Sequence, residues 1–237
     1  MQVEVSGAVA ATSPQMLKDG ARLSDAALAA QPSAQAYMVG AAWLRPSLLV
    51  SQERLKAGVL FDLSSLQQRA RQREKPDMAA LAERLASAIK AMPVTGRRTA
   101  ALIDPRAVEV NAPENHPVAA GDKLYYPLRP TTVRIVGAVQ QVCQLPLVPL
   151  QDAVRYLASC VVAAEADRDT IYVIEPDGRV FVQGIALWNR TAPIVLAPGA
   201  VVYVPFRASA AKKIDPALNS DVAAFLATQL LPGPGAQ

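Results

Sequence analysis

Alternating apolar and polar residues predict β-strands along this chain, and the most regular of these segments occurs twice. Three markers appear in the same order in each half: an alternating strand that ends in Gly-Ala-Val, a Leu-x-Asp-Ala sequence, and a strand of the form Gly-x-x-hydrophobic-Tyr-hydrophobic-Pro. They lie at residues 3–9, 23–26 and 121–127 in the first half, and at residues 133–139, 150–153 and 199–205 in the second. Three matches in register indicate a duplicated module.

The first copy is longer than the second because a segment with a different period interrupts it. Apolar residues in this segment recur every three, four or seven positions, which is typical of one face of an α-helix. The two apolar stripes are Leu48, Leu55, Val59, Leu63, Leu66 and Ala70, then Met78, Leu81, Leu85, Ala88, Ile89 and Met92. Pro76 lies between them, so we expect two antiparallel helices joined by a short turn.

The remaining pattern predicts a small α+β fold. In the first copy we expect strands at residues 36–44, 98–102 and 107–110. In the second we expect a helix at residues 150–162 and a β-hairpin around Pro176-Asp177-Gly178-Arg179. Strands packed around one helix suggest a β-grasp module, and an amphipathic helix is expected near residues 220–231.

The predicted organisation is two tandem β-grasp modules with a helical hairpin inserted in the first and an amphipathic helix at the C-terminus. The first module comprises residues 1–47 and 94–128, the insertion residues 48–93, the second module residues 129–207, and the tail residues 208–237.

Composition supports globular packing but suggests little about ligands. The chain is 51% hydrophobic and only 5% aromatic, with a net charge of +4, which permits weak attraction to anions. Its basic residues cluster at residues 69–75, 97–98 and 212–213, and we interpret the first cluster as a solvated helical face. Nucleic-acid binding is not expected, because the basic residues are not interleaved with aromatic residues.

No segment has the roughly 20 apolar residues that a membrane span requires, so no integral membrane span is expected. The first residues lack the charged and apolar regions of a signal peptide. The protein is therefore either cytosolic, or an exported protein from which the signal peptide has been removed.

Cys143 and Cys160 are 17 residues apart in the second module, and spacing alone leaves two readings open. In an oxidising compartment they could form a disulfide, which would stabilise the fold by about 3 kcal/mol in the chain-entropy model. Otherwise they are small buried hydrophobic residues.

The duplicated start and the closing strand at residues 199–205 resemble the SLBB-type β-grasp modules of bacterial polysaccharide export proteins. Four further stretches add to the likeness: Trp43-Leu44-Arg45-Pro46, Val94-Thr95-Gly96-Arg97, Asp177-Gly178-Arg179-Val180 and Ala186-Leu187-Trp188-Asn189. With the insertion, the whole arrangement resembles the GfcC-like capsule biosynthesis family. The resemblance implies a periplasmic protein of capsule or exopolysaccharide assembly in a Gram-negative bacterium, whose partners are polysaccharide or polysaccharide-export proteins.

Residues that could carry catalysis are few. His116 is the single histidine, which excludes a two-histidine metal site and argues against a Ser-His triad, so we expect no metal and no cofactor. Carboxylate chemistry on a sugar needs two acids on either side of the scissile bond. The candidates, Asp104, Glu109, Asp122 and Asp177, all lie in predicted turns or strand edges.

Arg97 is the leading candidate for a binding residue, because it lies where the chain returns from the insertion to the first module. A guanidinium group suits the carboxylates and hydroxyls of acidic sugars. The alternative is a structural arginine that ties the insertion to its module. Arg45, at the other root of the insertion, is a weaker companion. Trp43 and Trp188 are either sugar-stacking platforms or core residues.

Three functions follow from these observations. The first is a non-enzymatic periplasmic accessory protein, monomeric or weakly oligomeric, that binds glycan or an assembly partner between its modules. The second is an oligomeric structural component of a polysaccharide export conduit, which an exposed apolar face on the tail helix would favour. The third is a carboxylate-based polysaccharide-modifying enzyme.

Overall fold

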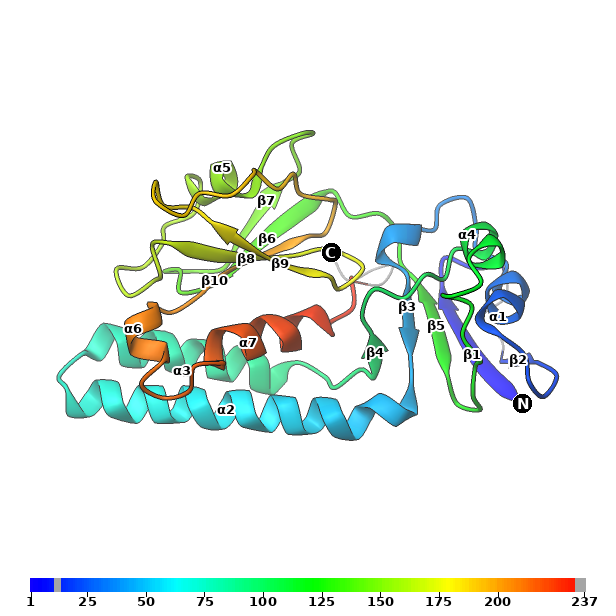
Figure 1. Cartoon of the computed structure of the whole chain (residues 1–237), viewed down its shortest axis with the longest axis horizontal. Helices are drawn as coiled ribbons and strands as arrows, with labels where there is room; N and C mark the ends of the chain where they lie inside the picture. The colour runs from blue at the N-terminus through cyan, green and yellow to red at the C-terminus, as the bar shows by residue number, and fades with distance from the viewer. Residues whose placement is uncertain (11–13, 233–237) are drawn as a thin grey trace.

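The computed structural model describes residues 1–10 and 14–232, and it has two five-stranded mixed sheets with helices packed around them (Figure 1). The predicted α+β class with two tandem β modules is confirmed. The first sheet has the order β2-β1-β5-β3-β4. Its strands are β1 (Gln2–Gly7), β2 (Gln15–Met16), β3 (Ala42–Leu44), β4 (Arg97–Arg98) and β5 (Lys123–Tyr126).

The second sheet has the equivalent order, β7-β6-β10-β8-β9. Its strands are β6 (Thr132–Gly137), β7 (Cys143–Pro146), β8 (Thr170–Ile174), β9 (Val180–Gly184) and β10 (Val201–Val204). In each sheet the first long strand pairs in parallel with the last one, β1 with β5 and β6 with β10, while the other pairings are antiparallel. The duplication in the sequence is thus a duplication of strand order and direction.

The repeated glycine of the Gly-Ala-Val marker occupies the same strained position in both modules. Gly7 and Gly137 have φ angles of 94° and 102°, a region that L-residues with a side chain seldom adopt. A Cβ atom at either position would collide with a carbonyl oxygen of the parallel neighbour, that of Tyr126 or Val204. Close approach of the two parallel strands therefore requires glycine here.

The insertion forms a long helical hairpin of α2 (Leu49–Gln72) and α3 (Pro76–Ala91), preceded by the 3₁₀ turn η2 (Pro46–Leu48). Its apolar face does not pack on the module that it interrupts. Val59, Leu63 and Ile89 belong to the hydrophobic core of the second module, whereas the first module has a separate core of its own. Figure 1 shows the hairpin extending away from the first sheet and beneath the second.

The tail helix lies between the hairpin and the second sheet. It comprises α7 (Leu218–Ala227), which follows the short α6 (Ala208–Ala211) and ends earlier than the sequence predicts. Val222 and Phe225 are fully buried, and α7 contacts α2, β8 and β9. The apolar face of this helix is therefore covered by its own chain.

Several segments differ from the sequence prediction in their local structure. Residues 107–110, expected as a strand, belong to α4 (Pro105–Val110), because the Asp104 carboxylate accepts hydrogen bonds from the backbone N–H groups of Arg106 and Ala107 and caps a helix. The helix expected at residues 150–162 is reduced to α5 (Ala153–Leu157), which is capped by Asp152 and is the counterpart of α1 (Leu23–Ala30) in the first module. Residues 38–40 form the 3₁₀ turn η1 (Met38–Gly40) ahead of β3, where a longer strand was expected.

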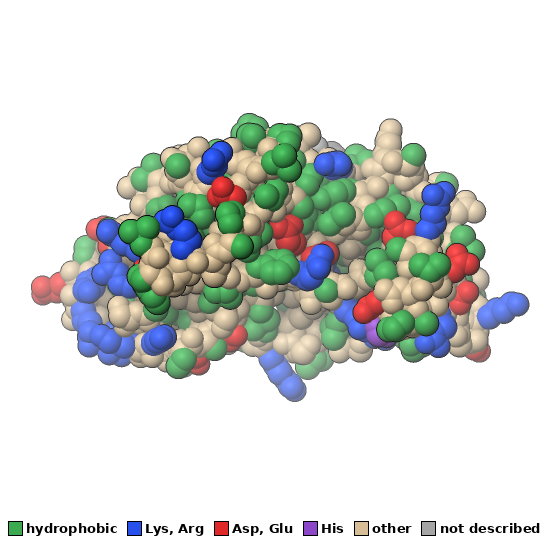
Figure 2. All heavy atoms as spheres, turned by 45° about the horizontal axis from the view of Figure 1, so that its top comes forward, with side chains coloured by type: hydrophobic (Ala, Val, Ile, Leu, Met, Phe, Trp, Pro, Cys, Tyr) green, Lys and Arg blue, Asp and Glu red, His purple; other side chains and the backbone are tan. Residues whose placement is uncertain are grey.

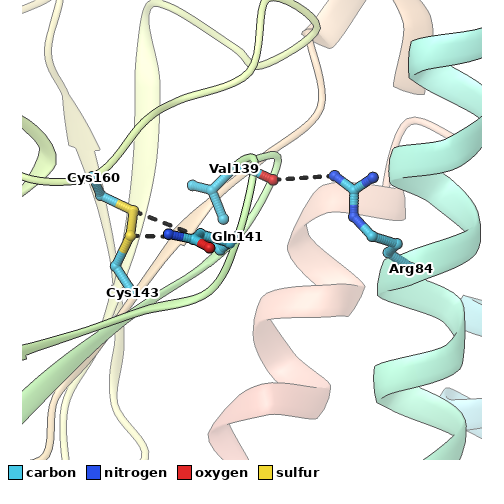
Figure 3. The surroundings of a disulfide bond; sticks show 5 residues. All are labelled: Arg84, Val139, Gln141, Cys143 and Cys160. Atoms are coloured by element: carbon cyan, nitrogen blue, oxygen red, sulfur yellow. Dashed lines mark hydrogen bonds between the residues drawn. A yellow bond between two sulfur atoms is a disulfide. The ribbon is translucent and has the colours of Figure 1, made fainter.

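Cys143 and Cys160 are joined by a disulfide bond, with their Cα atoms 6.0 Å apart (Figure 3). The bond links β7 to the segment after α5, at the side of the second module that faces α3. There the Arg84 guanidinium of α3 donates a hydrogen bond of 3.4 Å to the backbone carbonyl of Val139. Within the described residues, no helix has the length and apolar character needed to cross a bilayer.

Candidate functional site

The two roots of the insertion pair with each other as the short ribbon β3–β4. Trp43 lies opposite Arg98, and Leu44 lies opposite Arg97. Neighbouring side chains of a strand point to opposite faces, so the two arginines of β4 serve different surroundings. Arg97 faces the second module and Arg98 faces the first.

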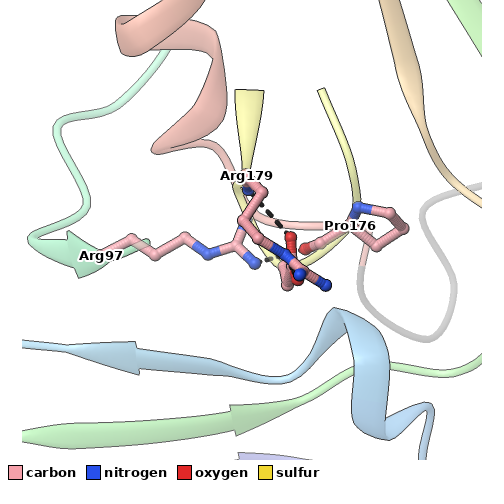
Figure 4. A network of polar contacts seen from close by, with 4 residues as sticks. Arg97, Pro176 and Arg179 are labelled. Atoms are coloured by element: carbon pink, nitrogen blue, oxygen red, sulfur yellow. Dashed lines mark hydrogen bonds and ion pairs between the residues drawn. The ribbon is translucent and has the colours of Figure 1, made fainter. Parts of the chain in front are cut away.

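Arg97 is a buried link between the first module and the elements around α7 (Figure 4). Its side chain is 4% exposed, and the guanidinium donates hydrogen bonds to the backbone carbonyls of Pro176, Ala227 and Gln229. Burial lowers the pKa of Arg97 to about 10, and the nearby charge of Asp177 partly opposes this shift. Three carbonyl acceptors engage this guanidinium, so its geometry favours the structural alternative.

Further hydrogen bonds fasten the same loop on both sides. The Gln52 side chain of α2 accepts from the Gly96 N–H and donates to the Arg97 carbonyl, each at 2.8 Å. The Thr95 hydroxyl donates to the carbonyl of Thr228 at 2.7 Å. The loop that joins α3 to β4 therefore has a fixed position against α2 and the end of α7.

Trp43 lies on the opposite face of the ribbon and has no exposed surface. The guanidinium carbons of Arg45 and Arg98 lie 4.3 and 5.5 Å from its ring centroid. Its indole N–H donates to the Asp122 carboxylate at 3.0 Å, and this carboxylate is itself buried and lies 3.6 Å from Arg45 Nε. Trp43 is therefore a core residue that organises two arginines, and a sugar could not reach its ring.

His116 completes this cluster. Its ring stacks on Trp43 with the centroids 6.2 Å apart, and its Nε2 atom lies 2.7 Å from Arg98 Nη2. Because a guanidinium can only donate, Nε2 is the acceptor in a hydrogen bond between these two groups. The Glu114 carboxylate lies 3.7 Å from the same nitrogen.

A cleft of about 520 Å³ opens where β4, α2, α7 and the turn between β8 and β9 meet, and we call it the inter-module cleft. Its lining residues are Leu48, Gln52, Arg97, Arg98, Thr99, Ala100, Gly178, Arg179, Val180, Ala224, Ala227 and Thr228. Three of these are arginines, and none of the described residues that line it is acidic. Arg179 is the most exposed of the three, and its Nε atom pairs with the Asp177 carboxylate at 2.6 Å.

The four binding residues predicted from the sequence do not form one site. Trp43, Arg45 and Arg97 lie together on or beside the β3–β4 ribbon, but only Arg97 lines the inter-module cleft. Trp188 lies apart from them in the loop after β9, with 77% of its side chain exposed.

Sequence reasoning did not select Arg98 or Arg179 as site residues. The signals that could have found them are the adjacent pair Arg97-Arg98 and the Asp177-Gly178-Arg179 turn, both visible in the sequence. Neither signal says that a hairpin of the second module lies against β4 of the first.

Two family models match this chain and together cover most of it. The model described as capsule biosynthesis GfcC, N-terminal, matches residues 3–129, and the one described as capsule biosynthesis GfcC C-terminal matches residues 141–231. A curated relative from Escherichia coli (strain K12), described as uncharacterized protein YjbG, is 30% identical over 190 residues, which is 79% of this chain and 76% of the relative.

Proposed function

The chain belongs to the GfcC capsule biosynthesis family, and from this membership we propose that it is a non-enzymatic accessory protein of capsule or exopolysaccharide assembly that binds glycan or an assembly partner. Its family assigns it to capsule biosynthesis, and the manner in which it acts is our proposal. The observation that carries the proposal is the inter-module cleft, which is lined by three arginines and, among the described residues, by no acidic one. Such a surface suits the carboxylates and hydroxyls of acidic sugars or an acidic segment of a partner.

The placement of the carboxylates supports a role without catalysis. Asp104 caps α4, and Asp177 pairs with Arg179. Asp122 accepts hydrogen bonds from Trp43 and from the backbone N–H of Ala119. These three candidate acids are engaged in contacts that hold the fold.

We further propose that the protein works in the periplasm. The bond between Cys143 and Cys160 supports this placement, because disulfides persist in oxidising compartments and are rare in the cytosol.

An export conduit is the less favoured role. Assembly of a conduit would be favoured by a tail helix with an exposed apolar face. In α7 that face is covered by α2, β8 and β9. Light scattering after size-exclusion chromatography should accordingly give a mass near 25.1 kDa that does not change with concentration. A discrete larger oligomer would favour the conduit.

Binding of acidic capsular polysaccharide to the purified protein tests the proposed function. We expect Arg179→Ala to weaken binding, because it removes the most exposed charge of the cleft, while Arg190→Ala, outside the cleft lining, has little effect. The polymer should keep its chain length after incubation. Shortening of the polymer would establish an enzyme, and equal effects of the two variants would remove the cleft from the proposal.

A further inference from the structure

A second groove lies at the closed end of the helical hairpin, where the turn between α2 and α3 meets the segment around α6. It has a volume of about 370 Å³, within the range of small-ligand sites, and we call it the hairpin-tip groove. Its lining residues are Leu66, Arg69, Ala70, Arg73, Glu74, Lys75, Pro76, Asp77, Met78, Glu165, Arg207, Ser209, Ala210 and Lys213. It shares no residue with the inter-module cleft.

Basic side chains converge on this groove from two separate parts of the chain. Arg69, Arg73 and Lys75 come from the hairpin, and Arg207 and Lys213 come from the segments on either side of α6. None of the five forms an ion pair with a carboxylate of the described residues. Figure 2 shows Lys and Arg side chains gathered at the same end of the molecule.

A solvated face of α2 accounts for only part of this charge. Basic residues near the end of a helix interact favourably with its dipole, which suffices for Arg69 and Arg73. The same reason does not place Arg207 and Lys213, from the other wall, beside them. Three carboxylates, those of Glu74, Asp77 and Glu165, also line the groove, so its lining has two more basic than acidic residues, and this excess positive charge favours an anion.

Two hydrogen bonds hold the walls of the groove in place and leave donors free. Arg69 Nη1 donates to the Lys213 carbonyl at 3.2 Å, which joins the hairpin to the segment after α6. Arg207 Nη2 donates to the Ala164 carbonyl at 2.8 Å. Each guanidinium has five N–H donors, so both arginines keep further donors for a ligand.

The groove also has an apolar floor. Leu66, Ala70 and Met78 are buried beneath the basic rim, and no large hydrophobic side chain that lines the groove is exposed. An apolar floor below a charged rim suits a sugar ring, which presents C–H faces and carries its charge at the edge. A bilayer surface fits less well, because the cations line a hollow.

We propose that the hairpin-tip groove binds an acidic oligosaccharide, with the sugar carboxylates held by the arginines and lysines of the two walls. The choice of a saccharide rests on the proposed role in capsule assembly, whereas the preference for an anion rests on the groove alone. The protein would then hold an acidic polymer at a point separate from the inter-module cleft.

Calorimetric titration of the full chain with tetragalacturonate at low ionic strength tests this inference. We expect binding that weakens as salt is added, and no binding of neutral maltotetraose. The double variant Arg73→Ala/Lys213→Ala removes one exposed cation from each wall and should weaken binding at least about fivefold. The matched control is Arg71→Ala/Lys212→Ala, which removes the same charge two residues from Arg73 and one residue from Lys213, outside the groove lining.

Four results would overturn the inference. Equal losses in the two double variants would mean that the general positive field attracts the probe. Equal binding of maltotetraose, or no detectable binding of tetragalacturonate, would exclude an acidic saccharide. Binding that is lost in Arg179→Ala but kept in Arg73→Ala/Lys213→Ala would place the ligand in the inter-module cleft, which refutes this site and leaves the proposed function standing.

Discussion

Replacing Arg97 by alanine should weaken the contact between the two modules, so that they no longer unfold as one unit. The guanidinium is the buried donor that reaches Pro176 in the hairpin turn and Ala227 and Gln229 at the end of α7. Alanine would keep β4 paired with β3 but would leave these backbone carbonyls without their donor. We therefore expect the effect at the junction between modules, with each sheet intact.

The size of the effect follows from the three hydrogen bonds. A hydrogen bond to a charged group contributes about 1.5–3 kcal/mol, and one of the three is long, at 3.4 Å. The cost of burying the guanidinium, seen in its lowered pKa, offsets part of the sum. We expect a loss of about 3 kcal/mol, which for a chain of this size lowers Tm by roughly 6–12 °C.

Differential scanning calorimetry of the purified chain measures this loss. We expect the Arg97→Ala transition to shift down and to split into two, because the modules have separate cores. Arg97→Lys should fall between the wild type and the alanine variant, since one ammonium group cannot reach all three carbonyls. Arg98→Ala is the neighbouring comparison: it removes contacts with Trp43 and His116 inside the first module, so its transition should shift without splitting. A single Arg97→Ala transition within about 1 °C of the wild type would refute the reasoning.

Three further predictions concern the second module. Burial, with the adjacent charge of Asp177, raises the pKa of Glu175 to about 6 from its ordinary 4.5, so the stabilising contribution of this carboxyl group is present below pH 4.5 and is lost as the pH rises through 6. Glu175→Gln should therefore be about 1 kcal/mol more stable than wild type in thermal unfolding at pH 7.5. A gain in stability that persists at pH 4 would contradict this sign. Reduction of the Cys143–Cys160 disulfide should lower stability by about 3 kcal/mol in urea unfolding, and the Cys143→Ala/Cys160→Ala variant should be insensitive to the reductant. Gly178 has a φ of 85°, and a Cβ there would lie 2.9 Å from the Ala227 carbonyl, so Gly178→Ala should cost about 1–3 kcal/mol in the same assay, a loss that should be absent if the turn moves freely.

The strand and helix patterns could be read from the sequence wherever the apolar period was strong. The two stripes of the insertion predicted α2 and α3 with nearly their observed bounds, and the repeated Gly-Ala-Val marker located β1 and β6. Short elements were less predictable. Residues 107–110 contain enough valine to suggest a strand, but the Asp104 side chain and Pro105 start a helix there, and a single cap outweighs strand propensity over so few residues.

The sequence alone determined that this protein is built from a repeated β module, with one helical hairpin inserted in the first copy. These are local properties, because period, turns and glycine positions act within a few residues of each other. Only the tertiary structure decided that the hairpin packs in the core of the second module and that α7 is covered by its own chain. It also decided that the Arg97 guanidinium donates to backbone carbonyls in the second module and at the end of α7. The apolar stripe of a helix shows that this face must be buried, but it does not identify the surface that covers it. The choice of partner depends on which distant surfaces fit together when the whole chain folds.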